Sequence, residues 1–243
     1  MTITTKPLRK IAEEYPSAVT VFERFEIDLC TWGDKDLAET CAGLQLSAEQ
    51  ILEKLEKNCF PGGAERDVTT LSLTQLIQRI VRTHHRRIRQ DLPALARMAD
   101  KLAGRHPGQS VSFARIAKNV DVLHSKLLAH IEKEEQILFP FIAQLEEETG
   151  GLSPTGRSHF ASVKQPIARM MQEHATAVET VDVLRQCTSA YQPAEEACPT
   201  QRALYGGLKN FEADLQQHLY LEEHVLFPRV IGLEMERLQG RSA

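Results

Sequence analysis

The stretch HIEKEEQILFP, residues 130–140, and the stretch HLYLEEHVLFP, residues 218–228, share the pattern H-x-x-x-E-E-x-[IV]-L-F-P. The second copy follows the first by 88 residues. A charged, solvent-exposed helix face has little physical reason to recur in the same register, and self-similarity at a fixed period indicates duplicated structural units. The pattern therefore predicts a helical hairpin that the chain uses twice.

Apolar residues recur at intervals of three and four along almost the whole chain, whereas alternating β-branched runs with hairpin turns are missing. Four long helical segments are predicted, separated by short stretches rich in proline and glycine; they cover residues 70–102, 110–148, 156–189 and 198–236. Helices of this length with short connections favour antiparallel neighbours. We therefore expect an all-α protein built on an up-down four-helix bundle.

The first 58 residues break into shorter helical pieces, with Pro7 and Pro16 at positions suited to helix starts and Ser47 with Gln50 resembling a capping box. Residues 59–68, CFPGGAERDV, collect one proline and two glycines between periodic segments. The sequence thus predicts a small helical module over residues 1–58, a linker over 59–68 and the four-helix bundle over 69–236.

Net charge and hydrophobicity argue against nucleic acid and membrane as partners. The 243 residues carry a formal charge of -4 with a pI near 6.2, so the chain has no basic field for a nucleic-acid backbone. The amino terminus lacks the apolar core of a signal peptide, and no run of about 18 apolar residues is present to span a bilayer. We expect a cytoplasmic protein that binds neither nucleic acid nor membrane, with its five cysteines reduced.

Each repeat carries a histidine and a glutamate four residues apart. Four residues advance an α-helix by about 400°, so the two side chains share one face of the helix. The first segment of each hairpin adds one histidine, 45 residues before His130 and 44 residues before His218. Six residues can therefore point at one interior position: His85, His130, Glu134, His174, His218 and Glu222.

Imidazole and carboxylate ligands suit non-haem iron or manganese, and the core of a helix bundle is where di-iron carboxylate sites are built. We expect two iron ions bridged by the two carboxylates, a ligand set that manganese also fits. Two buried glutamates would be costly without such a counter-charge. The adjacent Glu135 and Glu223 are expected in solvent, His84 at the surface, and the ILFP and VLFP endings in apolar packing.

These repeats resemble those of hemerythrin-type cation-binding domains, in particular the di-iron family called Repair of Iron Centres, of the YtfE/ScdA type. The segment HHRRIRQDLPAL resembles the family segment with a histidine eight residues before a proline, which selects His85 rather than His84. QEH at 172–174 resembles its third-helix glutamate-histidine pair, and VFERFEIDLCTWGDKDLAETC resembles its small N-terminal module. The resemblance covers nearly the whole chain.

The resemblance implies further roles for two residues. It places the Glu173 carboxylate on the approach to the metals, where it would serve as a general base or proton relay; its alternative is a plain solvated residue. The family usually has two adjacent cysteines followed by glycine in the N-terminal module, but this chain reads Cys30, Thr31, Trp32, Gly33. Vicinal dithiol chemistry is therefore excluded. Cys30 remains a candidate thiol nucleophile, transient iron or persulfide ligand, or intermolecular disulfide former giving a homodimer; its alternative is a small residue at a turn.

The implied function is repair or assembly of iron-sulfur clusters damaged by nitric oxide or oxidants, with iron donation as its mechanism. Damaged or apo iron-sulfur proteins would then be the partners, and nitric oxide or oxygen the small ligands. Two alternatives stay open at this point. One is a redox enzyme that reduces nitric oxide or turns over peroxide, and the other is a module that reversibly binds or senses oxygen or nitric oxide.

Overall fold

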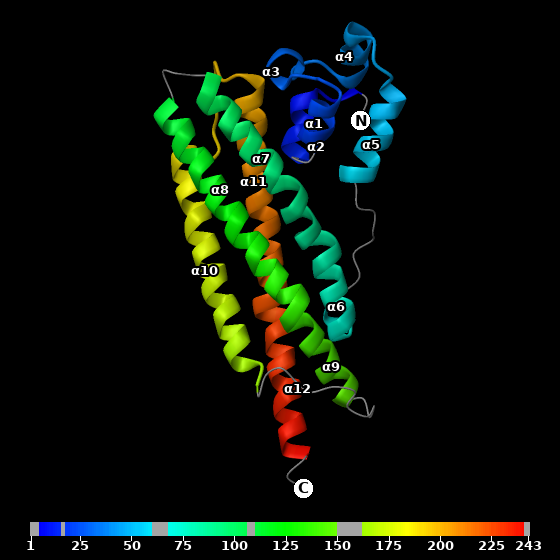
Figure 1. The fold of residues 1–243 in the computed structure, drawn as a ribbon, viewed down its shortest axis with the longest axis vertical. Helices are drawn as coiled ribbons and strands as arrows, with labels where there is room; N and C mark the ends of the chain where they lie inside the picture. The colour runs from blue at the N-terminus through cyan, green and yellow to red at the C-terminus, as the bar shows by residue number, and fades with distance from the viewer. Residues whose placement is uncertain (1–4, 16–17, 60–67, 106–109, 150–161, 241–243) are drawn as a thin grey trace. The chain divides into compact units, whose positions relative to one another are not determined.

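The computed structural model describes residues 5–15, 18–59, 68–105, 110–149 and 162–240. Helices account for most of this part, and it contains no β-strand, which confirms the all-α class. Figure 1 shows the course of the helices along the chain.

The four predicted long segments are all helical. The first comprises α6 (Leu73–Ile80), η3 (Val81–His85) and α7 (Arg86–Arg105). The second comprises α8 (Ser110–Lys133), η5 (Glu134–Leu138) and α9 (Phe139–Thr149). The third is α10 (Lys164–Cys187), and positions 156–161 of its predicted range lie outside the described residues. The fourth comprises α11 (Pro199–Tyr220), η6 (Leu221–Leu226) and α12 (Phe227–Gly240).

Three of these segments change from α- to π-helical hydrogen bonding near the predicted metal ligands. The π segment η3 ends at His85, η5 begins at Glu134, and η6 contains Glu222. Single π turns inside α-helices occur frequently at functional sites. The third segment differs, because His174 lies in the regular α-helix α10.

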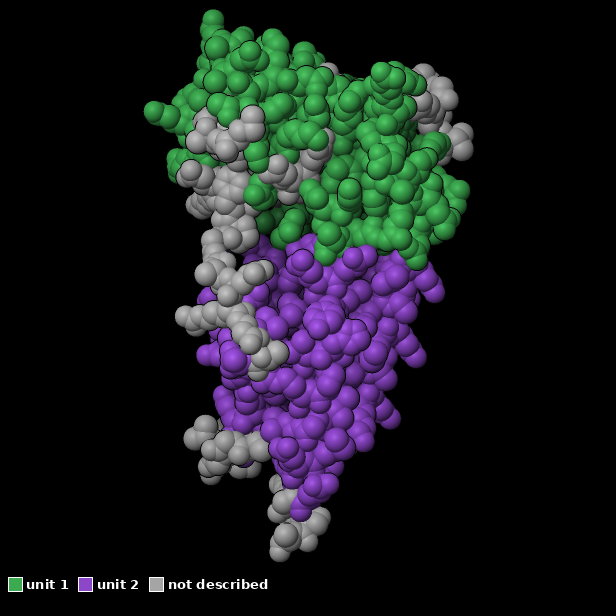
Figure 2. Space-filling view, turned by 180° about the vertical axis from the view of Figure 1, so that it is seen from behind, with its two compact units in different colours: residues 1–63, 87–124, 180–213 green, residues 64–86, 125–179, 214–243 purple. Residues whose placement is uncertain are grey.

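The chain divides into two compact units, coloured separately in Figure 2. Unit 1 consists of residues 1–63, 87–124 and 180–213, and unit 2 of residues 64–86, 125–179 and 214–243. Residues 60–67 of the expected linker lie outside the described part. The division into a module over 1–58 and a bundle over 69–236 therefore stays a prediction.

Unit 1 contains the short N-terminal helices. They are α1 (Leu8–Glu14), α2 (Ala18–Arg24), α3 (Leu29–Trp32), α4 (Leu37–Leu44) and α5 (Ala48–Cys59). Asp28, just before α3, accepts hydrogen bonds from Lys101 Nζ at 2.6 Å and Arg105 Nη1 at 3.2 Å, both on α7. The N-terminal helices are thus held against α7 within this unit.

The apolar core of unit 2 includes the ends of both repeats. Leu138 and Phe139 from the first copy, and Leu226 and Phe227 from the second, are buried. They pack with apolar side chains of α6, α9, α10 and α12. The prediction of apolar packing is confirmed for the Leu-Phe pair of each ending and for Val225, whereas Ile137 is 45% exposed and both prolines are exposed.

Two glutamates outside the quoted motifs bind the starts of neighbouring helices. Glu146 of α9 accepts from the backbone N–H groups of Leu73 (2.6 Å) and Thr74 (2.9 Å) at the start of α6. Glu234 of α12 accepts from the N–H of Val163 at 2.8 Å, just before α10. These carboxylates satisfy donors that a helix start leaves without partners in the helix. Glu234 follows Glu146 by 88 residues, so the duplication extends to the caps.

Candidate metal centre

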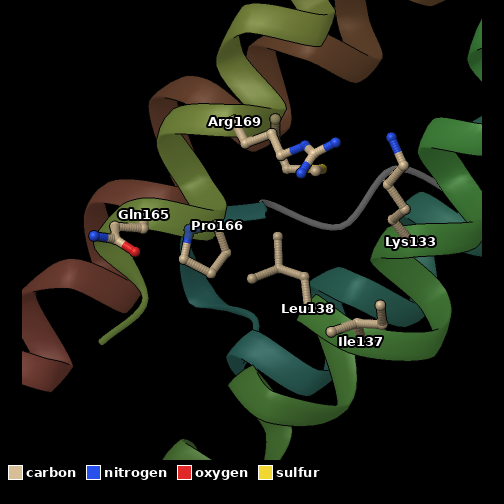
Figure 3. Close-up of a pocket in the computed structure, with 7 residues that line it drawn as sticks. Lys133, Ile137, Leu138, Gln165, Pro166 and Arg169 are labelled. Atoms are coloured by element: carbon tan, nitrogen blue, oxygen red, sulfur yellow. The ribbon is translucent and has the colours of Figure 1, made fainter. Parts of the chain in front are cut away.

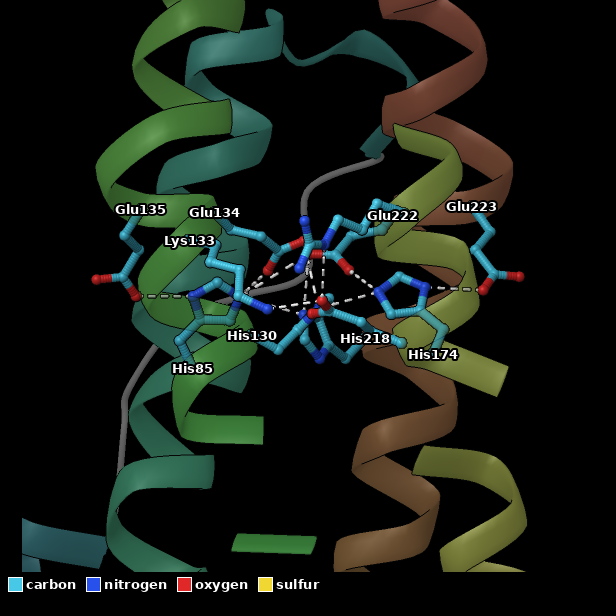
Figure 4. Close-up of polar contacts among 11 residues, drawn as sticks. His85, His130, Lys133, Glu134, Glu135, His174, His218, Glu222 and Glu223 are labelled. Atoms are coloured by element: carbon cyan, nitrogen blue, oxygen red, sulfur yellow. Dashed lines mark hydrogen bonds and ion pairs between the residues drawn. The ribbon is translucent and has the colours of Figure 1, made fainter. Parts of the chain in front are cut away.

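The six predicted ligands all lie in unit 2, and their side chains converge (Figure 4). Each is at most 2% exposed. Their ligand atoms form two groups, within each of which all atoms lie within 4.8 Å of one another. The first group is His85, Glu134, His218 and Glu222, and the second is His130, Glu134, His174 and Glu222.

Each carboxylate presents one oxygen to each group. Glu134 Oε2 lies 3.4 Å from His85 Nε2, while its Oε1 lies 3.4 Å from His130 Nε2. Glu222 Oε1 lies 2.9 Å from His218 Nε2, while its Oε2 lies 3.2 Å from His174 Nε2. The two glutamates therefore span the two histidine pairs.

The Nε2 atoms within each histidine pair also approach each other closely. His85 and His218 are separated by 3.1 Å at Nε2, and so are His130 and His174. Two nitrogen ligands at about 2.1 Å from one metal, at right angles, would be about 3.0 Å apart. Both pairs therefore have the spacing of adjacent ligands on a single ion.

The second glutamate of each repeat is not free in solvent, so that expectation was wrong. Glu135 Oε1 accepts a hydrogen bond from His85 Nδ1 at 2.7 Å, and Glu223 Oε1 accepts one from His174 Nδ1 at 2.8 Å. Both carboxylates flank the centre in Figure 4. Such a bond holds the imidazole in the tautomer whose Nε2 can bind a metal. Each repeat thus supplies two ligands, its histidine and its first glutamate. Its second glutamate orients a histidine of the neighbouring helix.

Glu173 has the same kind of contact. Its Oε2 accepts from His130 Nδ1 at 3.0 Å, and its Oε1 accepts from Lys133 Nζ at 2.6 Å. Arg169 Nε lies 3.5 Å from the same Oε1. Burial alone would raise the pKa of Glu173, but the hydrogen bonds from Lys133 and His130 outweigh it and lower the pKa. This carboxylate is therefore ionised at neutral pH and orients His130.

The phenylalanine of each repeat packs on a histidine ring. Phe139 stacks on His85 with ring centroids 5.7 Å apart, and Phe227 stacks on His174 at 6.1 Å. Both pairs are nearly parallel, with interplanar angles of 14° and 12°. The motif thus also fixes the plane of the imidazole that its glutamate orients.

His84 is a further departure from expectation. It is buried at 6% exposure rather than lying at the surface. Its ring stacks on His218, with centroids 5.5 Å apart and an interplanar angle of 10°, and its Nδ1 lies 3.2 Å from Asp214 Oδ1. Neither contact could be read from the chain, because both depend on how the first helical segment packs against the fourth.

Electrostatics at the centre favour a bound cation. Burial and the neighbouring Glu222 raise the pKa of Glu134 well above its usual range. Burial also lowers the pKa of His130 to about 4, which leaves its imidazole in the neutral form that binds metals. Both oxygens of Glu134 and Oε2 of Glu222 are buried without a hydrogen-bond partner among the described residues. A cation between the carboxylates would satisfy these atoms and remove their mutual repulsion.

Two cavities lie along the groove between the second and third long segments. One, of about 260 Å³, is lined by Lys126, Lys133 and Glu173 together with the predicted ligand His130. The other, of about 450 Å³, combines apolar Leu138 and Pro166 with charged Lys133 and Arg169 (Figure 3). Only the first has a predicted ligand among its described lining residues.

The remaining predicted site residue is Cys30, which belongs to α3 in unit 1. Its side chain lies outside the described part, as does that of Cys59. Among the described side chains, Cys41, Cys187 and Cys198 form no disulfide bond. None of the helices in the described ranges combines the length and hydrophobicity that a membrane span requires.

Two family models match the chain. Residues 76–230 match the hemerythrin HHE cation binding domain, and residues 4–58 match the ScdA_N domain of unknown function, DUF542. The first range contains all six predicted ligands and establishes the domain as a cation-binding one.

Similar proteins extend along almost the full chain. An iron-sulfur cluster repair protein YtfE from Citrobacter koseri is 33% identical over 96% of this chain and 100% of its own. Its namesake from Edwardsiella ictaluri is 35% identical over 96% and 99%, and that from Escherichia coli K12 is 33% identical over 94% and 98%. The chain belongs to the Repair of Iron Centres family of YtfE/ScdA type, whose members carry a hemerythrin HHE cation binding domain.

Proposed function

We propose that this protein binds two iron ions, each between one histidine pair and both carboxylates, and that Glu134 and Glu222 bridge them. The observation that carries this proposal is that each glutamate presents one oxygen to each histidine pair. Iron held by histidine and carboxylate supplies redox-active, exchangeable coordination. Because both carboxylates are shared, each metal has four protein ligands, two imidazole nitrogens and two carboxylate oxygens, which leaves positions for small ligands.

We further propose that the protein supports repair or assembly of iron-sulfur clusters damaged by nitrosative or oxidative stress, and that it does so by donating iron. The name of its relatives, iron-sulfur cluster repair protein, supports the first part. The cavity beside His130 supports the second, because iron cargo needs a route between a buried site and an acceptor. Damaged or apo iron-sulfur proteins would be the acceptors.

The role of general base or proton relay that the family resemblance implies for Glu173 stays a prediction. It already accepts hydrogen bonds from His130 and Lys133, and those bonds hold it ionised. We propose that, as an ionised carboxylate lining the cavity beside His130, it also orients the His130 imidazole.

Iron stoichiometry tests the site. The protein loaded anaerobically with ferrous iron should hold two ions per chain, and the His130→Ala/His218→Ala variant should bind far less, because it removes one ligand from each group. The matched control is His224→Ala, since His224 is exposed and belongs to neither group. Undiminished binding in the double variant would refute the assignment, and loading with manganese in parallel tests metal choice.

Transfer experiments separate donation from the two alternatives. Mössbauer spectra of the iron-loaded protein, taken before and after adding an apo iron-sulfur acceptor and then nitric oxide, follow where the iron goes. Movement of iron into the acceptor with restored cluster activity supports donation. Catalytic formation of nitrous oxide with an electron donor would instead favour a reductase, and a stable, reversible gas adduct without either would favour sensing.

We also propose that Cys30 acts as a thiol during transfer, either toward iron or by linking two chains. The chain has no adjacent cysteine at position 31, so Cys30 would act singly. Cys30→Ser should slow cluster repair while leaving iron stoichiometry unchanged, with Cys187→Ser as the control. Unchanged repair in Cys30→Ser would exclude this role, and chromatography with and without reductant would reveal a disulfide-linked dimer.

A further inference from the structure

The duplicated hairpins allow the surroundings of the four histidines to be compared position by position. Three of the four donate from Nδ1 to a carboxylate of a neighbouring helix, namely His85 to Glu135, His174 to Glu223 and His130 to Glu173. His218 is the exception. Its Nδ1 is buried and has no hydrogen-bond partner within the described parts of the chain.

The residue that breaks the pattern is His84. Glu173 directly precedes His174 and reaches His130, the ligand contributed by the first repeat. In the other hairpin, His84 directly precedes His85 and lies against His218, the ligand contributed by the second repeat. Position 84 is thus equivalent to position 173. Glu173 accepts a hydrogen bond from His130, whereas His84 stacks its imidazole on the ring of His218.

The helical backbone differs at the same place. His84 and His85 belong to the π segment η3, whereas Glu173 and His174 belong to the regular α-helix α10. Asp214 lies beside His84, at 3.2 Å from its Nδ1, and is 8% exposed. Asp214 precedes His218 by four residues on α11, and its carboxylate lies against His84.

A carboxylate on Nδ1 fixes the tautomer and orientation of a metal-binding histidine and makes its Nε2 more basic; its loss typically lowers metal affinity about 10–100-fold. We infer that the two metal positions are unequal, and that the ion between His85 and His218 is held less tightly than the ion between His130 and His174. This inference rests on the proposed two-iron site and identifies its labile iron as the one that is donated.

The experiment is a chelator challenge of the anaerobic, iron-loaded protein, followed by absorbance of the ferrous chelate. One equivalent should leave fast and one slowly, with rates about 10–100-fold apart. An anomalous difference map of the half-depleted protein should show the retained ion between His130 and His174. Equal release rates, or retention between His85 and His218, would overturn the inference while leaving the two-iron proposal intact.

Substitutions at positions 84 and 173 should change the release rate of the ion at one metal position each. His84→Glu places a carboxylate beside His218 and should slow the fast phase, while the matched His84→Gln, of equal length and without charge, should slow it much less. Asp214→Asn combined with His84→Glu removes the like charge that could destabilise the single variant. Glu173→Gln should speed the slow phase and bring the two rates together.

Failure of the proposed two-iron site would give a different experimental result from failure of this inference. Should the wild-type protein hold only one ion, the two-iron count fails, and the position of that ion still decides the inference. An ion between His130 and His174 agrees with it, and an ion between His85 and His218 contradicts it. A fast phase that His84→Glu leaves unchanged, in a variant that folds and holds two ions, also contradicts it.

Discussion

Glu135 Oε1 lies 2.7 Å from His85 Nδ1, although the two residues belong to different helical segments and are 50 positions apart. In the second hairpin, Glu223 and His174 repeat the contact at 2.8 Å and 49 positions. Each H-x-x-x-E-E motif therefore holds its neighbour's histidine as well as supplying two ligands of its own. The adjacent glutamates have separate tasks, one facing the metals and one facing the back of an imidazole.

Replacing the orienting carboxylate should weaken metal binding without removing a ligand. Glu135→Ala is expected to lower affinity at the His85 position about 10–100-fold, measured by competition with a chelator of known affinity. The metal affinity of Glu135→Gln should lie between those of Glu135→Ala and the wild type, because the amide oxygen still accepts a hydrogen bond but carries no charge. Glu132→Ala is the control, since Glu132 is exposed on the same helix. Equal effects at positions 132 and 135 would contradict the assignment.

Neutralising a ligand carboxylate should separate the stability of the metal-free protein from metal binding. Burial and repulsion from Glu222 raise the pKa of Glu134, so the metal-free protein carries an unfavourable buried charge or an added proton there. Glu134→Gln removes that penalty, and its metal-free Tm should equal or exceed that of the wild type.

Metal should then raise the Tm of the wild type only. At a free metal concentration of about 100 Kd, binding to the folded state contributes about 2.7 kcal/mol per site. Calorimetry with chelator and with added ferrous iron measures both effects. A wild-type Tm that does not depend on metal would show that the ion contributes nothing to the fold.

The aromatic residue that ends each motif should matter for stability. Phe227 is 1% exposed and stacks on His174, so Phe227→Ala is expected to cost about 3–5 kcal/mol of unfolding free energy. Phe227→Leu should cost less and still loosen the His174 ring. Tyr220→Leu is a suitable control, because Tyr220 is 58% exposed on the same segment. Denaturant unfolding of the metal-free proteins gives the values, and a cost below that of the control would refute the packing argument.

Glu146 should make stability depend on pH. Burial alone would raise the pKa of Glu146, but hydrogen bonds from Thr74 and Leu73 and the nearby Arg229 lower it. Its stabilising contribution is then fully present above the unfolded-state pKa near 4.5, and it is lost as pH falls through the lower folded-state pKa. Glu146→Gln should therefore destabilise the protein by about 1–2 kcal/mol at neutral pH.

The same variant has a signature in acid. The difference in unfolding free energy between wild type and Glu146→Gln should shrink as pH falls below about 4.5, because the wild-type carboxylate becomes protonated. Glu147→Gln, at the exposed neighbouring position, serves as the control and should show neither effect. A difference that stays constant down to acid pH would mean that the charge of Glu146 is not what binds the start of α6.

Much of the fold and the ligand set follows from local pattern. Apolar periodicity predicted the long helices, since burial of one helix face depends on spacing along a single segment. The repeated histidine and glutamate, four residues apart, placed both on one face for the same reason. The structure brings together all six residues so chosen.

Contacts between segments required the tertiary structure. Glu135 and Glu223 looked like solvated charges, and His84 like a surface residue, because their partners lie 49 to 134 positions away in the chain. The π segments also change the direction of side chains at the motif, and no residue pattern announces them. The sequence by itself determined the helical class and which residues could bind metal. Packing between helices alone decided which carboxylate holds which imidazole, because hydrogen-bond partners depend on the relative register of neighbouring helices. The same packing left His218 Nδ1 without a carboxylate partner among the described residues.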